Sequence, residues 1–199
     1  MKHPICLGIT GASGAVYAVR LLEVLRTTGR DVHLSISPSG RDVIRQELGL
    51  AVDLDDFRTS QLLPDDDVRG RIHYFHWQDF MAPMASGSFL TAGMVICPCS
   101  GTTLSAVAAG AAGNLIQRAA EVQLKERRKM ILVPRETPLS LPHVENMRRC
   151  LEAGAVVLPA SPGWYHGVRE VNDLVDFVVA RICDQLGVEH SLTNRWGAE

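Results

Sequence analysis

Short apolar runs recur along this chain, and most of them are apolar at consecutive rather than alternate positions. They are rich in β-branched residues, and a turn containing Gly, Ser or Pro usually follows. Strands of a parallel sheet that is covered on both faces have this pattern. The runs predict strands at residues 4–9, 32–36, 72–75, 93–97, 130–133 and 155–158.

Between these runs, apolar residues recur at the spacing of an amphipathic helix. This pattern predicts helices at residues 16–26, 103–112, 115–128, 143–153 and 171–186. Alternating strands and helices form right-handed βαβ units. We therefore predict an α/β fold with a doubly wound, mainly parallel sheet between two layers of helices. We see neither an internal repeat nor a linker, so residues 1–199 are expected to form a single domain.

Composition and charge exclude several classes of protein. The 199 residues are 46% hydrophobic and 21% charged, and the net charge is −2, so no overall basic character favours nucleic acid. The apolar run at the start is too short for a signal peptide, and no stretch approaches a membrane span. We expect a soluble, cytoplasmic protein with reduced cysteines and no membrane partner. The aspartate-rich segment 53–70 is expected to be a solvated loop, and we predict no metal site.

Small residues and hydroxyls follow the first two predicted strands, where a doubly wound sheet binds its ligands. The segment 10–15 reads TGASGA, which lets a phosphate approach the backbone near a helix N-terminus, although it is not GxGxxG. Ser37 ends the second strand at the point where dinucleotide-binding folds place an acid. This position counts against NAD and allows FMN.

A second hydroxyl-rich loop follows the predicted strand 93–97. Its residues Ser100 and Thr103 either only cap the next helix or contribute to a ligand site. Two such loops on neighbouring strands would form one continuous cradle, so their convergence favours a ligand.

Basic residues gather on and after the helix predicted at 115–128. Arg118 and Lys125 are seven positions apart and therefore share a face. The run 127–129 (Arg, Arg, Lys) closes this helix, where a solvated basic face is the ordinary interpretation. Arg135 and Glu136 follow the next strand, in the ligand position. Arginine suits a flavin or phosphate oxygen, and glutamate suits proton transfer.

Six motifs occur in register from residue 5 to residue 196. They are TGASG at 10–14, ASGS at 85–88, CPCS at 97–100, RAAEVQLKERR at 118–128, PRETP at 134–138 and RW at 195–196. Together they resemble the flavin prenyltransferases of the UbiX/Pad family. Each motif by itself is modest, and the ordered set is specific.

The resemblance implies a Rossmann-like, flavodoxin-like three-layer sandwich that assembles as a homo-oligomer, typically a dodecamer. It also implies an enzyme that binds reduced FMN and dimethylallyl monophosphate and joins the prenyl group first to a flavin nitrogen and then to a neighbouring ring carbon. The product, prenylated FMN, passes to a UbiD-type decarboxylase in ubiquinone synthesis or aromatic acid metabolism. No metal is implied.

Matching positions carry the family's site residues onto this sequence. The flavin set is Gly11, Ala12, Ser13, Ser37, Ser100, Thr103 and Arg135. The set for the substrate phosphate is Ser86, Arg118, Lys125, Tyr165 and Arg181. Glu47 and Glu136 match acids near the reacting flavin edge, with Ser13 as a proton relay, although QELG at 46–49 departs from the family pattern. Trp196 matches an aromatic residue of the tail, and the tail (188–199) is expected to pack on a neighbouring subunit.

Three alternatives belong to other functional classes. A flavin-dependent decarboxylase of the phosphopantothenoylcysteine type would show PxMN where this chain has PRET. A non-enzymatic FMN carrier, or an accessory subunit of an aromatic acid decarboxylase, would leave the cations and Glu136 without a role. An NAD oxidoreductase is disfavoured by the missing acid after the second strand.

Overall fold

Six parallel strands form one sheet in the order β3-β2-β1-β4-β5-β6. The computed structural model describes residues 3–64, 69–193 and 197. The strands are β1 (Ile5–Ile9), β2 (Val32–Ile36), β3 (Ile72–Tyr74), β4 (Gly93–Cys99), β5 (Met130–Pro134) and β6 (Val156–Val157). Every predicted strand is present, and β4 continues two residues beyond its predicted end. The order reverses between β1 and β4, which is the switch point of a doubly wound sheet.

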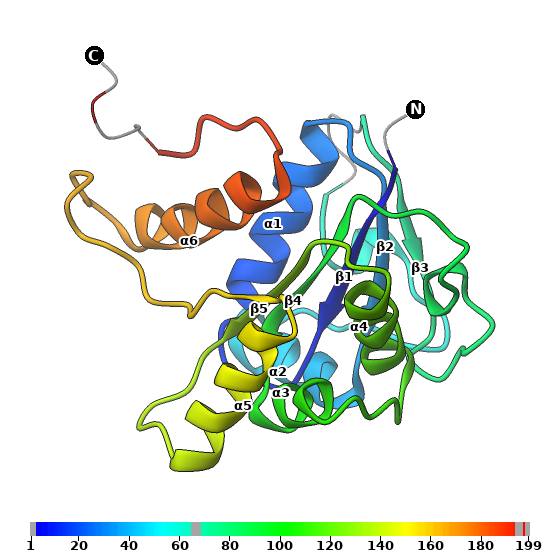
Figure 1. The fold of residues 1–199 in the computed structure, drawn as a ribbon. Helices are drawn as coiled ribbons and strands as arrows, with labels where there is room; N and C mark the ends of the chain where they lie inside the picture. The colour runs from blue at the N-terminus through cyan, green and yellow to red at the C-terminus, as the bar shows by residue number, and fades with distance from the viewer. Residues whose placement is uncertain (1–2, 65–68, 194–196, 198–199) are drawn as a thin grey trace.

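Helices cover both faces of this sheet, so the predicted three-layer α/β sandwich is confirmed (Figure 1). One face is covered by α1 (Ala15–Thr27), α2 (Pro38–Leu48) and α6 (Val171–Leu186). The other face is covered by α3 (Gly101–Ala108), α4 (Leu115–Lys125) and α5 (Leu141–Glu152). Two short 3-10 turns, η1 (Thr59–Gln61) and η2 (Pro83–Ala85), lie in the connections.

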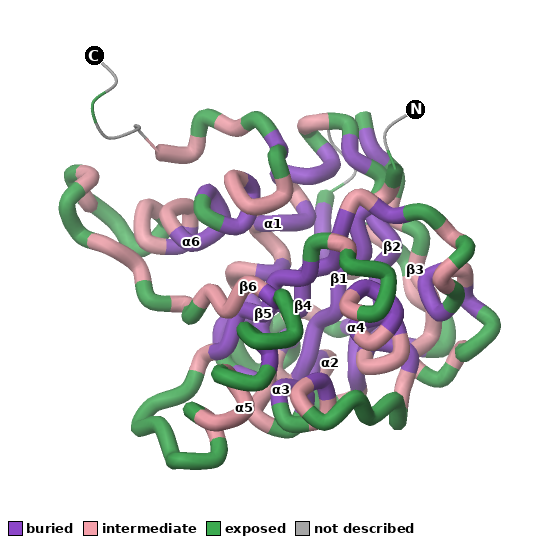
Figure 2. Tube along the Cα trace, viewed as in Figure 1, coloured by how far each residue is buried: buried purple, intermediate pink, exposed green. Residues whose placement is uncertain are grey.

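Alternate residues of the strands supply two separate hydrophobic cores. Leu7 and Ile9 of β1 pack with the layer that contains α1 and α6, whereas Cys6 packs with the layer that contains α4. The strands β1, β2, β4 and β5 are buried, whereas the edge strands β3 and β6 are only partly covered. In Figure 2 much of the loops beside α5 and before α6 is exposed. The two-sided burial explains why the strands read as continuous apolar runs.

Helix α2 was not predicted, although the sequence carries its signals. The Ser37 hydroxyl accepts a hydrogen bond from the Gly40 amide at 3.0 Å, and Pro38 occupies the first turn. Gly49 ends the helix with a left-handed φ of 69°. Its few apolar residues gave a weak helical period, and only docking on α1 makes them a buried stripe.

Helix α4 ends at Lys125 rather than at residue 128 as predicted. The backbone of Arg127 has φ 53°, which is incompatible with helix continuation. Arg128 therefore leaves the helical surface and points to other partners.

The described parts of the chain also show the state of the cysteines, the grouping of possible metal ligands and the character of the helices. All five cysteines are free and buried. No group of three or more His, Cys, Asp or Glu side chains there is placed to hold a metal ion. Among the described helices, none has the length and apolar character needed to cross a membrane.

Candidate active site

The loops after β1 and β4 are joined by one buried hydroxyl. The Thr10 hydroxyl donates to the carbonyl of Pro98 at 2.8 Å and accepts from the Ser100 amide at 2.9 Å. Thr10 is 2% exposed. The two predicted hydroxyl-rich loops therefore form one continuous wall at the carboxyl edge of the sheet. Sequence analysis did not single out Thr10, but its place at the end of a strand beside the CPCS strand was a usable signal.

The N-terminus of α2 lies directly against the first of these loops. A Cβ atom at Gly11 would be 2.5 Å from both Cβ and Oγ of Ser39. The Ser39 hydroxyl is 3.3 Å from that of Ser37. Glycine at position 11 is thus required by close packing, and Ser39 adds a hydroxyl to the predicted set that sequence analysis missed.

Ser100 caps α3, as one of the two interpretations of its sequence allowed. Its hydroxyl accepts from the Thr103 amide at 3.2 Å and lies 3.0 Å from the Thr103 hydroxyl. Thr103 is 6% exposed, whereas Ser100 is half-buried. Of the two, Ser100 is therefore better placed to present its hydroxyl to a ligand.

Glu47, from the last turn of α2, occupies the N-terminus of α1. Its Oε2 atom accepts from the Gly14 and Ala15 amides, both at 2.9 Å. Burial acts to raise the pKa of this carboxyl, but hydrogen bonds from Ser13 and from these two amides, together with the charge of Arg135, lower it. The carboxylate takes the position where sequence analysis had expected a phosphate. The N-terminus of α1 is thus already closed by an anion of the protein itself, with the Ser13 hydroxyl bonded to the same carboxylate.

Arg135 connects the β5 loop to this group. Its Nε donates to the Ser13 carbonyl at 3.3 Å. Arg135 and Glu136 also line a cavity of about 420 Å³ between the ends of β5 and β6, which Met147 and Pro159 help to close. The structure thus brings Ser13, Glu47 and Arg135 together beside a cavity that Glu136 faces.

Ser86, Arg118 and Lys125 form a second group on the outer layer. Arg118 Nε donates to the Ala85 carbonyl at 3.2 Å. A Cβ atom at Gly87 would be 2.8 Å from Lys125 Nζ, so the ASGS segment touches the end of α4. Both cations have acidic partners: Arg118 pairs with Glu121 at 2.6 Å and Lys125 with Glu126 at 2.5 Å.

This second group is not at the carboxyl edge of the sheet. Lys125 and Ser86 immediately precede β5 and β4 in the chain, at the ends where these strands begin. The carboxyl edge is separated from them by the seven residues of β4, roughly 20 Å at ~3.3 Å per residue. Within one chain, Lys125 and Ser86 therefore lie at the opposite end of β4 from the loops that hold Ser13 and Ser100.

Tyr165 and Arg181 lie on the opposite layer, beside or within α6. The Tyr165 ring packs edge-on against Phe177, with centroids 5.8 Å apart. Arg181 pairs with Asp184 at 3.1 Å. Neither residue is on the helix layer that holds Lys125. Trp196, predicted to complete the site, lies outside the described residues.

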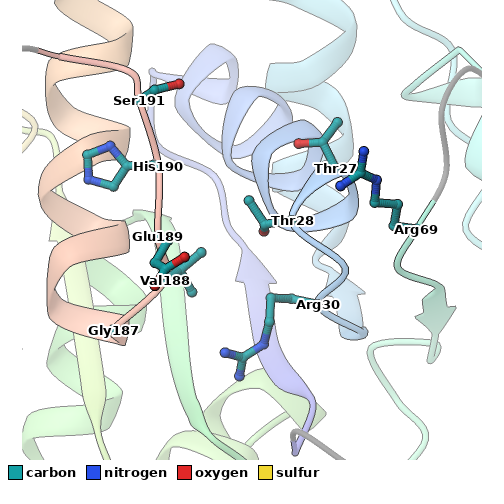
Figure 3. A pocket seen from close by; sticks show the side chains of 9 residues that line it. All are labelled: Thr27, Thr28, Arg30, Arg69, Gly187, Val188, Glu189, His190 and Ser191. Carbon is teal, nitrogen blue, oxygen red and sulfur yellow. The ribbon is translucent and has the colours of Figure 1, made fainter.

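Another cavity, of about 550 Å³, lies at the beginning of the strands (Figure 3). Its walls come from the ends of α1 and α6, and none of the predicted site residues lines it. The residues that line this cavity are Thr27, Thr28, Arg30, Arg69 and residues 187–191. Among them, His190 pairs with Asp184 at 3.2 Å and accepts from the Leu192 amide at 3.3 Å, which fastens the start of the tail to α6. This cavity is therefore separate from the candidate active site.

The switch point of this α/β sheet carries hydroxyls, loop backbone and an arginine, which suit a flavin. Residues 1–183 match the Flavoprotein family, so the chain is a flavin-binding α/β protein. Curated relatives narrow the class. The chain is 49% identical to "Flavin prenyltransferase UbiX" of Pseudomonas aeruginosa, over 98% of this chain and 94% of that protein. It is 46% identical to the protein of the same name from Halalkalibacterium halodurans, over 97% and 93%. The chain belongs to the UbiX flavin prenyltransferase family.

Solved structures agree with this assignment over the full length. A UbiX protein described as AnUbiX (PadA1), in complex with FMN and dimethylallyl pyrophosphate, superimposes with a TM-score of 0.86 at 35% identity and covers all of both chains. A structure described as a dodecameric FMN-dependent UbiX-like decarboxylase from Escherichia coli O157:H7 has a TM-score of 0.84 at 39% identity, again over all of both chains.

Proposed function

We propose that this protein transfers the dimethylallyl group of dimethylallyl monophosphate to reduced FMN and so makes prenylated FMN. The observation that carries the proposal is the joined group of Ser13, Glu47 and Arg135 at the carboxyl edge, in a chain 49% identical to a flavin prenyltransferase. The hydroxyls of Ser37, Ser39 and Ser100 at this edge suit the phosphate and the ribityl chain of FMN.

The residues of the carboxyl edge hold and orient the flavin. Arg135 is fixed by the Ser13 carbonyl, so its guanidinium stays at the edge of the cavity, where it can bind a flavin oxygen. Glu47 is kept ionised by the amides of α1. Closing the fourth ring removes a proton from the ring carbon and adds one to the alkene carbon. Glu136, which faces the cavity, is the group we assign to this proton transfer, with Ser13 as a relay.

The cations of α4 stabilise the departing phosphate. The bond between the allyl carbon and oxygen breaks as the bond to the flavin nitrogen forms, and the electron pair leaves with the phosphate. The proton that this nitrogen carries in the reduced flavin is released, and the departing phosphate takes it up. Arg118 and Lys125 are donors for the charge that grows there, and Ser86 adds a hydroxyl. Tyr165 and Arg181 are assigned to the same phosphate.

Because one chain separates these two groups by the length of the sheet, we propose that an active site forms between copies of the chain. Flavin loops of one copy would meet the Ser86, Arg118 and Lys125 group of another. Trp164 and Leu141 are 70% and 73% exposed, which leaves apolar surface for such contacts. One similar protein is described as dodecameric, and we propose the same state here. The start of the predicted tail, with Val188 and Leu192, packs on its own chain, so only the part after residue 192 is proposed to pack on a neighbour.

We propose that a UbiD-type decarboxylase receives the product and that both proteins work in the cytoplasm. The five free, buried cysteines of this chain suit a reducing compartment.

The proposal is tested anaerobically. Purified protein is incubated with reduced FMN and dimethylallyl monophosphate, and the molecular mass of the extracted flavin is measured by mass spectrometry. A gain of one prenyl unit is expected, with loss of that gain in Lys125→Ala and Glu136→Gln but not in the control variants Lys129→Ala and Glu152→Gln. Unchanged FMN with either the monophosphate or the diphosphate, despite tight flavin binding, would favour a carrier or a flavin-dependent decarboxylase.

The shared site has its own test. Subunits carrying Lys125→Ala are mixed with subunits carrying Glu136→Gln during assembly. If flavin and phosphate residues come from different copies, some sites contain neither change, and part of the activity returns. A mixture as inactive as its two components would show that each site belongs to one chain.

A further inference from the structure

The middle of the segment that carries Ser86 and Ser88 is held from outside by Arg128. We call residues 85–91, which connect η2 to β4, the serine loop. Arg128 Nη2 donates to the Gly87 carbonyl at 2.5 Å, and Nη1 donates to the Phe89 carbonyl at 2.7 Å. The planar guanidinium thus spans the two carbonyls on either side of Ser88, a fork that a lysine cannot reproduce.

The left-handed turn after α4 makes this contact possible. Arg127 has φ 53°, so the chain turns away from the helical path, and Arg128 donates from its own amide to the Gln123 carbonyl at 2.9 Å. Arg128 is half-buried, whereas Arg127 and Lys129 are exposed. One member of the basic run is therefore part of a built contact, and its neighbours remain on the surface.

The far end of the serine loop is seated on the sheet. The Phe89 ring stacks on that of His33 with centroids 5.0 Å apart and an interplanar angle of 21°. The Thr91 hydroxyl donates to Gln123 Oε1 at 2.8 Å, and both side chains are buried. Arg118 fixes the near end through the Ala85 carbonyl. Between these two ends, the described contacts of the loop backbone with side chains are those of Arg128.

The position of the middle of the serine loop decides whether the loop can take part in binding the phosphate. Gly87 lies so close to the end of α4 that a Cβ atom there would be 2.2 Å from Glu126 Oε1 and 2.8 Å from Lys125 Nζ. The hydroxyls of Ser86 and Ser88 are 3.0 Å apart. A displaced loop would move Ser86 and Ser88 relative to the end of α4 that carries Lys125, so the loop and the ammonium would no longer be held for the same phosphate.

We infer that Arg128 is a positioning residue for the phosphate pocket: by bridging the Gly87 and Phe89 carbonyls it holds the serine loop against the end of α4 that carries Lys125. The inference rests on the proposed function, which assigns Ser86 and Lys125 to the allyl phosphate. It adds a residue that touches neither the flavin loops nor the cavity at the ends of β5 and β6.

The test compares Arg128→Gln and Arg128→Lys with the adjacent control Arg127→Gln, which removes the same charge. Losing the fork is expected to raise KM for dimethylallyl monophosphate about tenfold, since hydrogen bonds to charged groups contribute on this scale. The Kd for FMN should stay within about twofold, because Arg128 contacts the serine loop and none of the residues assigned to the flavin. Arg128→Lys, which can reach one carbonyl only, should give an intermediate KM, and Arg127→Gln should behave as wild type.

Two results would overturn the inference. One is a wild-type KM in Arg128→Gln or, where that variant does not fold, in Arg128→Lys. The other is a parallel loss of FMN affinity, melting temperature and phosphate affinity, which indicates a general structural role. Titration of the FMN-loaded protein with inorganic phosphate gives a reading that is independent of catalysis. If wild-type protein fails to prenylate FMN, the proposed function is wrong, whereas this titration still decides whether Arg128 shapes an anion pocket.

Discussion

Glu47 Oε2 lies 2.9 Å from the Gly14 amide, although the two residues come from different helices and are 33 positions apart in the chain. The contact closes the N-terminus of α1 with a carboxylate from the end of α2. An anion at a helix N-terminus is stabilised by the helix dipole and by the exposed amides. The same contact places Glu47 beside Ser13 and within the field of Arg135.

Replacing Glu47 with Gln should destabilise the protein modestly at neutral pH. The amide keeps the shape and one acceptor oxygen but loses the charge at the helix terminus, a loss of about 0.5 kcal/mol. Because the pKa of Glu47 is lowered by folding, this stabilisation is present above the pKa of the unfolded carboxyl and disappears as the pH falls through the folded value. Urea unfolding at pH 7 and in acid measures the difference, with Glu189→Gln as the control. An equal difference at both pH values would contradict the electrostatic explanation.

Thr10→Val should weaken both the fold and flavin binding. The change keeps the shape but removes the hydroxyl that joins the Pro98 carbonyl to the Ser100 amide, leaving two polar groups in a buried place. The expected cost is about 1–3 kcal/mol. Chemical denaturation and fluorescence titration with FMN measure the two effects. Thr27→Val is the matched control, because its hydroxyl lies at the exposed end of α1; an effect no larger than that of the control would rule out the bridge.

Gly11→Ala should reduce both stability and FMN affinity, and a second change should restore the stability. The new methyl group would lie 2.5 Å from the Ser39 side chain, so the loop and α2 must separate. Ser39→Gly removes the atoms that the methyl group meets, and the double variant should therefore regain the stability that Gly11→Ala loses. Ser39→Gly alone reports how much its hydroxyl contributes to flavin binding. A double variant as unstable as Gly11→Ala would place the strain elsewhere.

His33 should make the protein less stable in mild acid. Its ring is buried among aromatic rings, and burial first, and then the nearby His73, lowers the pKa of His33 to about 4. The unfolded chain protonates His33 near pH 6.5, so stability is full above that value and falls as the pH drops toward the folded pKa, by roughly 2 kcal/mol between pH 7 and pH 5.

The variant His33→Phe tests this dependence. It preserves the stacking on Phe89 and removes the titration, so its stability should change less between pH 7 and pH 5 than that of the wild type. His3→Phe, a change near the exposed start of the chain, is the control. A pH dependence that is identical in His33→Phe and wild type would assign the acid sensitivity to other groups.

The strands could be predicted because a strand that is buried on both faces has apolar residues at consecutive positions. Residues 32–36 and 171–186 were predicted with the observed bounds. Helix α2 was missed because its apolar stripe is defined by its contact with α1, and α4 was predicted too long because the left-handed turn at Arg127 is not visible in a basic run.

The candidate site was likewise predicted in part from the sequence and in part only from the structure. Sequence motifs named Ser13, Glu47 and Arg135, and the structure shows that they touch. The sequence by itself determined the order of strands and helices, the family and the residue types at each strand end, since these follow from local composition and spacing. Only the tertiary structure decided that a carboxylate occupies the α1 N-terminus, that Thr10 joins two loops and that Arg128 holds the serine loop. Each depends on groups distant in the chain, whose approach is set by packing of the whole sheet and its helices.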